Sequence, residues 1–279
     1  MSVRILLCMS VQSQKLSVQA ATKFIISLAT ADLLFCSIIL PINVITKDLN
    51  ETLCSVYIFF YTGTCTVSMS SLLAITINRY IIICHNDIYN KVYSNFNVAI
   101  MIFIIWLVCF GVNILPVFGI YGQYGIDAEK DGCDFQPDKN SNEIYLIADI
   151  ILFIYYILPC LAIIACYAAI FSKVRKTKKD FRRSLGDEAL NSKETDLQLL
   201  KMIVIIFAAF LVCFIPRFCI QFIEKPDNSV IIDIILSLFR VNFIINPFIY
   251  GFKNKVYQPA FIKLYQRIFC NTCASTSTI

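Results

Sequence analysis

The chain has 279 residues, of which 58% are hydrophobic and only 15% are charged, and its mean hydropathy is +0.71. Soluble domains carry about 25% charged residues, so this composition excludes a soluble enzyme, a disordered protein and a nucleic-acid-binding module. Lys and Arg outnumber Asp and Glu by 24 to 19, and the resulting net charge of +5 is too small to indicate a polyanionic partner.

Six segments are long and apolar enough to cross a bilayer as helices, which takes roughly 20 residues each. They are Phe24–Ile45, Ser55–Ile77, Val98–Tyr121, Ile150–Ser172, Met202–Ile223 and Val230–Phe252. With helical extension at their ends, we predict spans over about residues 24–46, 54–84, 97–121, 144–172, 197–223 and 230–252, forming an all-α membrane bundle within residues 1–252. Residues 253–279 are expected to form a short cytoplasmic amphipathic helix and a tail. The apolar stretch Val3–Val11 is too short to span, and we interpret it as the inner end of an earlier, largely missing helix.

The distribution of Lys and Arg among the loops predicts the orientation, because cytoplasmic loops are enriched in both. The run KVRKTKKDFRR at Lys173–Arg183 and the segment after the last span are basic, whereas Gly122–Glu143 is mainly acidic. We therefore place the basic loops in the cytoplasm and the acidic loop outside. This arrangement is that of a multi-pass protein of the plasma membrane.

Cysteine positions agree with this orientation. Of 13 cysteines, only Cys54 and Cys133 fall on the outer side, where an oxidising environment favours one disulfide between that loop and the helix. Asn50 begins a glycosylation sequon on the same side. Cys270 and Cys273, after the cytoplasmic amphipathic stretch, are palmitoylation candidates or plain free thiols.

Asp32 is an acidic residue near the middle of the first span, where ionisable groups are costly and commonly functional. Ser68, Asn242 and Asn246 are polar residues near the middle of other spans. Together these four residues could hold a sodium ion or a proton, or they could form only an interhelical hydrogen-bond cluster. No cofactor other than this ion is expected.

Prolines lie inside five of the six predicted spans. They are Pro41, Pro116, Pro159, Pro216 and Pro247. Each removes a backbone hydrogen bond and is expected to kink its helix, which membrane bundles tolerate because neighbouring groups satisfy the freed carbonyls.

The polar and proline positions combine into a pattern that runs the length of the chain. The pattern consists of LATAD ending in Asp32, Cys54, Asn78-Arg79-Tyr80, Trp106, Cys133, Pro159 with Tyr167, the series Phe210, Cys213, Phe214 and Pro216, and Asn246-Pro247-Phe248-Ile249-Tyr250. In this order and on these spans, the motifs resemble the rhodopsin-like family of G-protein-coupled receptors. The resemblance implies a seven-helix receptor fold, here with six complete spans and a remnant of the first.

Two stretches narrow the resemblance to one branch of the family. Ser70–Ser94 looks like the melatonin-receptor type, and Phe118–Cys133 looks closer still to the invertebrate receptors moody and trapped in endoderm. The chain departs from the usual family pattern at two positions. Asn78 stands where an acidic residue is usual before Arg79, and Phe214 stands where a tryptophan is usual.

The resemblance implies an activation switch at the inner side. An Arg79–Asp196 pair would hold the inactive state closed, although Asp196 could instead serve the helix dipole. Tyr167 and Tyr250 would swing towards Arg79 on activation. The remaining switch residues are Asn78, Tyr80, Phe210, Phe214, Pro216 and Pro247. The implied partners are a heterotrimeric G-protein and arrestin-like regulators on the cytoplasmic face, together with the lipid bilayer.

The outer half would bind a small-molecule or lipid ligand. Tyr61 replaces the aspartate that pairs with amines, and Arg240 replaces the lysine that carries retinal in opsins. Arg217 and Arg240 would need carboxylates or an anionic ligand, and Asp233 is an alternative partner for one of them. The expected ligand-binding residues are Tyr57, Tyr61, Arg217, Gln221 and Arg240.

Other functions fit the sequence less well. A transporter would predict internal repeats, and none is evident between the halves. An intramembrane enzyme would need a catalytic cluster, whereas the one histidine, His85, falls at the inner end of a span. We therefore expect a receptor rather than an enzyme, with a non-signalling truncated receptor as the alternative.

Overall fold

The computed structural model describes residues 20–44, 50–127, 132–136, 147, 149–181, 204–217, 219 and 229–253. The chain divides into two compact units. One comprises Val18–Ser184, and the other comprises Met1–Ser17 with Leu185–Ile279. Each unit is described by itself.

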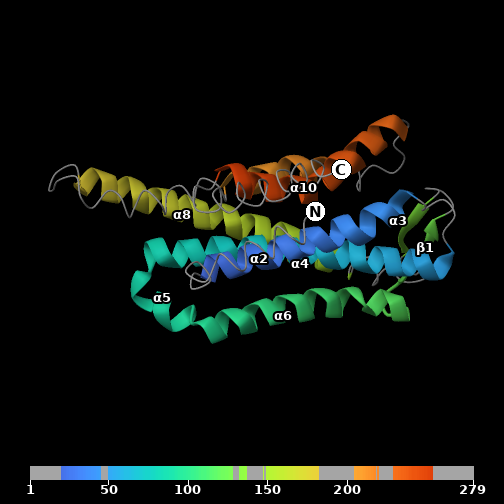
Figure 1. Cartoon of the computed structure of the whole chain (residues 1–279), viewed down its shortest axis with the longest axis horizontal. Helices are drawn as coiled ribbons and strands as arrows, with labels where there is room; N and C mark the ends of the chain where they lie inside the picture. Colours follow the sequence, from blue (N-terminus) through green and yellow to red (C-terminus); the bar gives the residue numbers. More distant parts are fainter. Residues whose placement is uncertain are drawn as a thin grey trace, which may run out of the picture. The chain divides into compact units, whose positions relative to one another are not determined.

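The unit Val18–Ser184 is a helical bundle with one small hairpin (Figure 1). Its helical elements are α2 (Ala20–Leu34), the π-helix η1 (Phe35–Ile39), α3 (Leu40–Val44), α4 (Glu51–Cys84), α5 (Asn86–Val92), α6 (Asn95–Asn113), the 3-10 helix η3 (Leu115–Phe118), the π-helix η4 (Phe153–Ile157) and α8 (Leu158–Phe181). The hairpin consists of β1 (Gln123–Asp127) and β2 (Gly132–Gln136). The central helix α4 contacts α2, α6, α8 and both strands.

Four helical segments of the described residues are long and apolar enough to cross a membrane. They are Ala20–Ile42, Glu51–Cys84, Asn95–Phe118 and Asp149–Lys176. These segments correspond to the first four predicted spans, with all ends but the one at Cys84 shifted. α4 begins at Glu51 because the Asn50 side chain accepts the Leu53 N–H across 2.9 Å as an N-cap. α8 continues past the predicted end to Phe181, because a helix need not stop where its apolar residues stop.

The predicted span 97–121 is too long at its outer end. The α-helix ends at Asn113 and a 3-10 turn carries the chain to Phe118. Gly119 then adopts φ 72°, Tyr121 φ 60° and Gly122 φ 124°. These left-handed conformations end the helix and turn the chain into the hairpin.

Two of the prolines follow π-helical turns. η1 ends two residues before Pro41, and η4 ends two residues before Pro159. A proline lacks an N–H and its ring collides with the carbonyl four residues earlier. A wider π turn relieves that collision and keeps the helix continuous. The sequence predicted kinks at these prolines but not their form.

α4 packs closely against α6 at Gly63. A Cβ placed on Gly63 would lie 2.6 Å from the Phe110 ring, so a larger residue there would require the ring to move. The Trp106 ring stacks on Phe110 with centroids 5.7 Å apart, and its Nε1 donates to Ser27 Oγ across 2.9 Å. α2, α4 and α6 thus lie side by side around a buried core (Figure 1).

The antiparallel hairpin was not predicted from the sequence. Its register pairs Gln123 with Gln136 and Ile126 with Cys133. The predicted all-α bundle therefore carries a small β element in its acidic outer loop.

The second unit is described over the helix Val204–Arg217 and over α10 (Ser229–Lys253). The two helices meet through buried aromatic rings, with 6.3 Å between the centroids of Phe214 and Phe239. The Phe210 and Phe214 rings stack at 5.2 Å. The helix Val204–Arg217 covers part of the predicted span 197–223, and α10 covers the predicted span 230–252.

Candidate functional site

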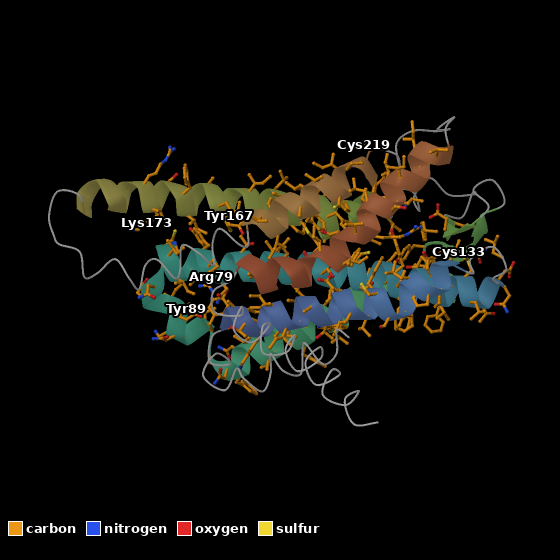
Figure 2. The ribbon with its side chains drawn as sticks, turned by 45° about the horizontal axis from the view of Figure 1, so that its top comes forward. Arg79, Tyr89, Cys133, Tyr167, Lys173 and Cys219 are labelled. Carbon is orange, nitrogen blue, oxygen red and sulfur yellow. A yellow bond between two sulfur atoms is a disulfide. The ribbon has the colours of Figure 1, made fainter. Side chains whose placement is uncertain are left out.

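The inner end of α4 holds the predicted Asn78-Arg79-Tyr80 motif. Asn78 and Arg79 are buried, with 0% and 3% of their side chains exposed. Asn78 Nδ2 donates a hydrogen bond to Tyr89 Oη across 3.4 Å, which joins α4 to α5. The Asn78 Oδ1 atom is buried with no hydrogen-bond partner among the described residues. Figure 2 shows Arg79, Tyr89, Tyr167 and Lys173 at this end of the unit and Cys133 at the other.

Tyr167 reaches this cluster from α8. Its phenol lies within electrostatic range of the Arg79 guanidinium and close to the Thr76 hydroxyl (Figure 2). The resemblance implied that Tyr167 approaches Arg79 on activation. In this structure the two side chains already interact, so the arrangement brings together three of the predicted switch residues, Asn78, Arg79 and Tyr167.

Aromatic contacts extend the cluster towards the cytoplasm. Tyr80 Oη lies 3.2 Å from His85 Nε2, with ring centroids 5.4 Å apart. Tyr89 stacks on Tyr93 at 5.2 Å, and burial, with the nearby Tyr89, raises the pKa of Tyr93 to about 12. The sequence named Tyr80 and His85 separately. Their contact joins the last turn of α4 to the residue that follows it. In the sequence, the only signal for this contact is the spacing of five residues between two side chains with rings.

Two of the four predicted ion-site residues meet within the first unit. Asp32 is buried, with 1% exposed, and Ser68 Oγ donates to its Oδ1 across 3.1 Å. Asn242 and Asn246 lie one turn apart on α10 in the second unit, and both are buried. Carboxylate, hydroxyl and amide oxygens are the donors that a hard cation prefers, so the residue types fit a sodium ion.

A disulfide joins Cys54 of α4 to Cys133 of β2, with their Cα atoms 5.5 Å apart. This is the pair that the outer positions of the two cysteines predicted. The bond holds the hairpin against the outer end of α4. Asn50, at the same end, is exposed and caps α4 through its Oδ1 atom, which leaves its amide nitrogen for the predicted glycan.

Tyr124 of β1 fixes the hairpin to two helices, which the sequence did not predict. Its phenol donates to the Asn113 carbonyl across 3.1 Å and lies 3.4 Å from Thr62 Oγ1. Its own carbonyl accepts from Ser55 Oγ across 3.0 Å. Burial raises the pKa of Tyr124, and the hydrogen bond with Thr62 offsets part of this increase. The hairpin is therefore held by polar contacts as well as by the disulfide.

The predicted ligand residues Tyr57 and Tyr61 lie on the outer half of α4. Their ring centroids are 6.0 Å apart, and Tyr61 also lies 5.7 Å from Phe35 of η1. Tyr57 is buried and Tyr61 is half-buried, so other residues of the bundle partly cover these two predicted ligand-binding side chains.

The other predicted residues fall in the second unit or outside the described residues. Arg217 and Arg240 are half-buried, and they follow Phe214 by three residues and Phe239 by one. Pro216, Pro247 and Tyr250 lie in the two helices of this unit. The residues outside the described part of the chain are Asp196, Gln221, Cys270 and Cys273.

Comparison with known proteins shows the family. Residues 4–250 match the family described as 7 transmembrane receptor (rhodopsin family). Protein trapped in endoderm-1 of Drosophila melanogaster is 30% identical over 273 residues, which cover 88% of this chain and 69% of that protein. The G-protein coupled receptor moody of Drosophila pseudoobscura pseudoobscura is 27% identical, with 91% of this chain and 48% of that protein covered. The chain thus spans about half the length of moody. Melatonin receptor type 1A of Mus musculus also matches, at 27% identity over 97% of this chain and 77% of that receptor.

The fold comparison agrees. The structure of squid rhodopsin superimposes with a TM-score of 0.78 at 22% sequence identity and covers 96% of this chain and 77% of that structure. The matching family and fold confirm the receptor branch and the membrane bundle predicted from the motifs. The chain therefore belongs to the rhodopsin family of G-protein-coupled seven-transmembrane receptors, which are multi-pass proteins of the plasma membrane.

Proposed function

We propose that this receptor responds to an anionic, lipid-like small molecule that is held by Arg217 or Arg240. The observation that supports this proposal is that both arginines are half-buried and lie within three residues, along their helices, of Phe214 and Phe239, whose rings are in contact. A guanidinium in apolar surroundings requires an anionic partner. A carboxylate or phosphate supplies one and can bind the guanidinium through two hydrogen bonds.

A ligand screen with paired compounds tests this proposal. Acidic lipids, each matched with its neutral ester, are applied to cells that express the receptor, and G-protein dissociation is recorded. Substituting the responsible arginine, in Arg217→Gln or Arg240→Gln, should weaken an acidic agonist by about 1.5–3 kcal/mol, because charged hydrogen bonds have that strength. A neutral agonist should lose little. Unchanged acidic-agonist potency in both variants, at equal surface expression, would contradict the proposal.

We also propose that sodium binds at Asp32 and stabilises the inactive state. The support is the buried Asp32 carboxylate, which accepts a hydrogen bond from Ser68, because carboxylate and hydroxyl oxygens are the ligands that a hard cation prefers. Asn242 and Asn246 are the remaining proposed ligands. Agonist affinity is measured in sodium chloride and in choline chloride. We expect Asp32→Asn to abolish the difference and Ser71→Ala, on the same helix as Ser68, to retain it. Wild-type affinity that is equal in both salts would leave Asp32 as a hydrogen-bond centre.

At the cytoplasmic end, we propose that Arg79 pairs with Asp196 in the resting receptor and is released for G-protein coupling. Arrestin-like regulators would bind the same end, and the chain itself would have no catalytic activity. The support is the burial of Arg79 within the cluster that Tyr89 and Tyr167 complete. Asp196→Asn should raise agonist-independent nucleotide exchange on the G-protein, whereas Glu194→Gln, two residues away, should leave it unchanged.

A further inference from the structure

A stripe of exposed residues runs along α8 from its apolar part into its basic part. Leu161, Ile164 and Phe171 are 55%, 52% and 56% exposed. Together with the exposed Ala168 they recur every three or four residues, so they share one face of the helix. In a membrane receptor such a face lies against lipid. The next position on the same stripe, four residues after Phe171, is Arg175.

Arg175 is exposed and rests on that stripe. Its guanidinium carbon lies 4.1 Å from the centroid of the Phe171 ring, which is a cation–π contact. A cation–π contact does not use the guanidinium N–H groups as conventional hydrogen-bond donors, so they remain available to another partner. Phe171 therefore holds the guanidinium on the exposed, lipid-facing side of α8, with its hydrogen-bond donors available.

The depth of Arg175 matches that of phospholipid headgroups. The apolar segment of α8 ends at Lys176, and Ile150–Ser172 carries no charge. Arg175 therefore lies at the cytoplasmic boundary of the bilayer. It also belongs to Lys173–Arg183, in which seven of 11 residues are basic and Asp180 is the one acid. Basic clusters directly after a membrane helix attract the anionic lipids of the cytoplasmic leaflet.

Lys173 provides a contrast on the same helix. It lies two residues before Arg175, which places it on a different face. Its ammonium is within electrostatic range of Cys84, at the inner end of α4, so it is directed towards the bundle (Figure 2). One basic side chain thus faces the neighbouring helix and the other faces lipid.

We propose that Arg175 and Phe171 form a binding site for an anionic phospholipid headgroup of the cytoplasmic leaflet. The guanidinium binds the phosphate through paired hydrogen bonds, a geometry that a lysine cannot provide. The Phe171 ring fixes the guanidinium and packs against the glycerol and upper acyl carbons. The exposed Lys176 adds charge without the same geometry.

The test uses the full chain in nanodiscs of phosphatidylcholine that contain a small fraction of phosphatidylinositol bisphosphate. Native mass spectrometry of the released receptor counts the retained anionic lipid. We expect Arg175→Gln to lower retention at least about fivefold and Phe171→Leu to lower it about threefold. Lys173→Gln removes the same charge from another face and should change retention less than about twofold.

Two results would overturn the proposal. Equal losses in Arg175→Gln and Lys173→Gln would show that only the summed charge of the segment attracts lipid. Unchanged retention in Arg175→Gln, together with reduced G-protein nucleotide exchange in nanodiscs of pure phosphatidylcholine, would show that Arg175 contacts an acidic surface of the G-protein instead. Replacing the bisphosphate lipid with phosphatidylserine at equal total charge then shows whether the site requires a phosphomonoester.

Discussion

The Asn78 amide donates a hydrogen bond to the Tyr89 phenol across 3.4 Å and thereby ties the inner end of α4 to α5 beside the buried Arg79. Asn78 stands where the family usually has an acid, so Arg79 lacks a neighbouring carboxylate at this point. The residue at this position therefore joins the motif to α5 through a neutral hydrogen bond. Agonist-independent activation of the G-protein should therefore depend on the residue at position 78.

We expect Asn78→Asp to lower agonist-independent G-protein activation by about three- to tenfold. A carboxylate next to the buried Arg79 would form an ion pair of low solvent exposure, which strengthens the attraction and favours the resting state. Guanine-nucleotide exchange in membranes without agonist measures the effect. Asn90→Asp adds the same charge on the exposed side of α5 and should change little, and an equal decrease in both variants would contradict the prediction.

The Tyr124 phenol should control the mobility of the outer hairpin. Tyr124→Phe leaves the Asn113 carbonyl without this donor and should destabilise the anchored hairpin by about 1–2 kcal/mol. Amide hydrogen exchange should accelerate in β1 and β2 but not in α5. Tyr89→Phe, which also removes one phenol hydroxyl but at the opposite end of α4, serves as the control and should leave exchange in the hairpin unchanged.

Gly63 and Gly111 offer a matched pair for testing the packing of α4 on α6. A Cβ on Gly63 would lie 2.6 Å from the Phe110 ring, whereas a Cβ on Gly111 would meet nothing within 4 Å. Gly63→Ala should destabilise the receptor by about 1–3 kcal/mol through overpacking. Gly111→Ala should be neutral or slightly stabilising, because alanine favours a helix over glycine. Thermal unfolding of purified receptor measures both.

A second substitution makes this test specific. Phe110→Leu in the Gly63→Ala background removes the ring that the new methyl group would strike. It should restore part of the lost stability, since contacting residues are energetically coupled. If the double variant is less stable than Gly63→Ala by the full cost of Phe110→Leu alone, the two residues do not compete for the same space.

The membrane bundle could be predicted from sequence because spanning length and apolar composition are local properties. The first four predicted spans correspond to helices, and errors occurred only at their ends. Asn50, which caps α4, and Gly119, which ends η3 after α6, set those ends through backbone geometry that composition does not reveal. The hairpin was not predicted because its five-residue strands are short and their pairing depends on contacts with α4.

The residues of the candidate site could be predicted where they belong to sequence motifs. They could not be predicted where the site depends on hydrogen bonds between side chains. Asp32 and Ser68 were expected to meet, and they do. The hydrogen bonds from the Asn78 amide to the Tyr89 phenol and from the Tyr124 phenol to the Asn113 carbonyl each join two different elements of the unit. Neither Tyr89 of α5 nor Tyr124 of β1 belongs to a sequence pattern that identifies such a partner.

The disulfide and the Tyr124 contacts hold the same hairpin, so their loss should not be additive. Cys133→Ser should reduce surface expression, because removing a native disulfide commonly costs about 2–5 kcal/mol and this bond closes a separation of 79 residues. Cys219→Ser, at an exposed free cysteine, is the control and should have no effect. In a double-mutant cycle with Tyr124→Phe, the combined loss should be smaller than the sum, since a hairpin already released by one change has less to lose from the other. Strictly additive losses in unfolding free energy would show that the two contacts stabilise separate parts of the receptor.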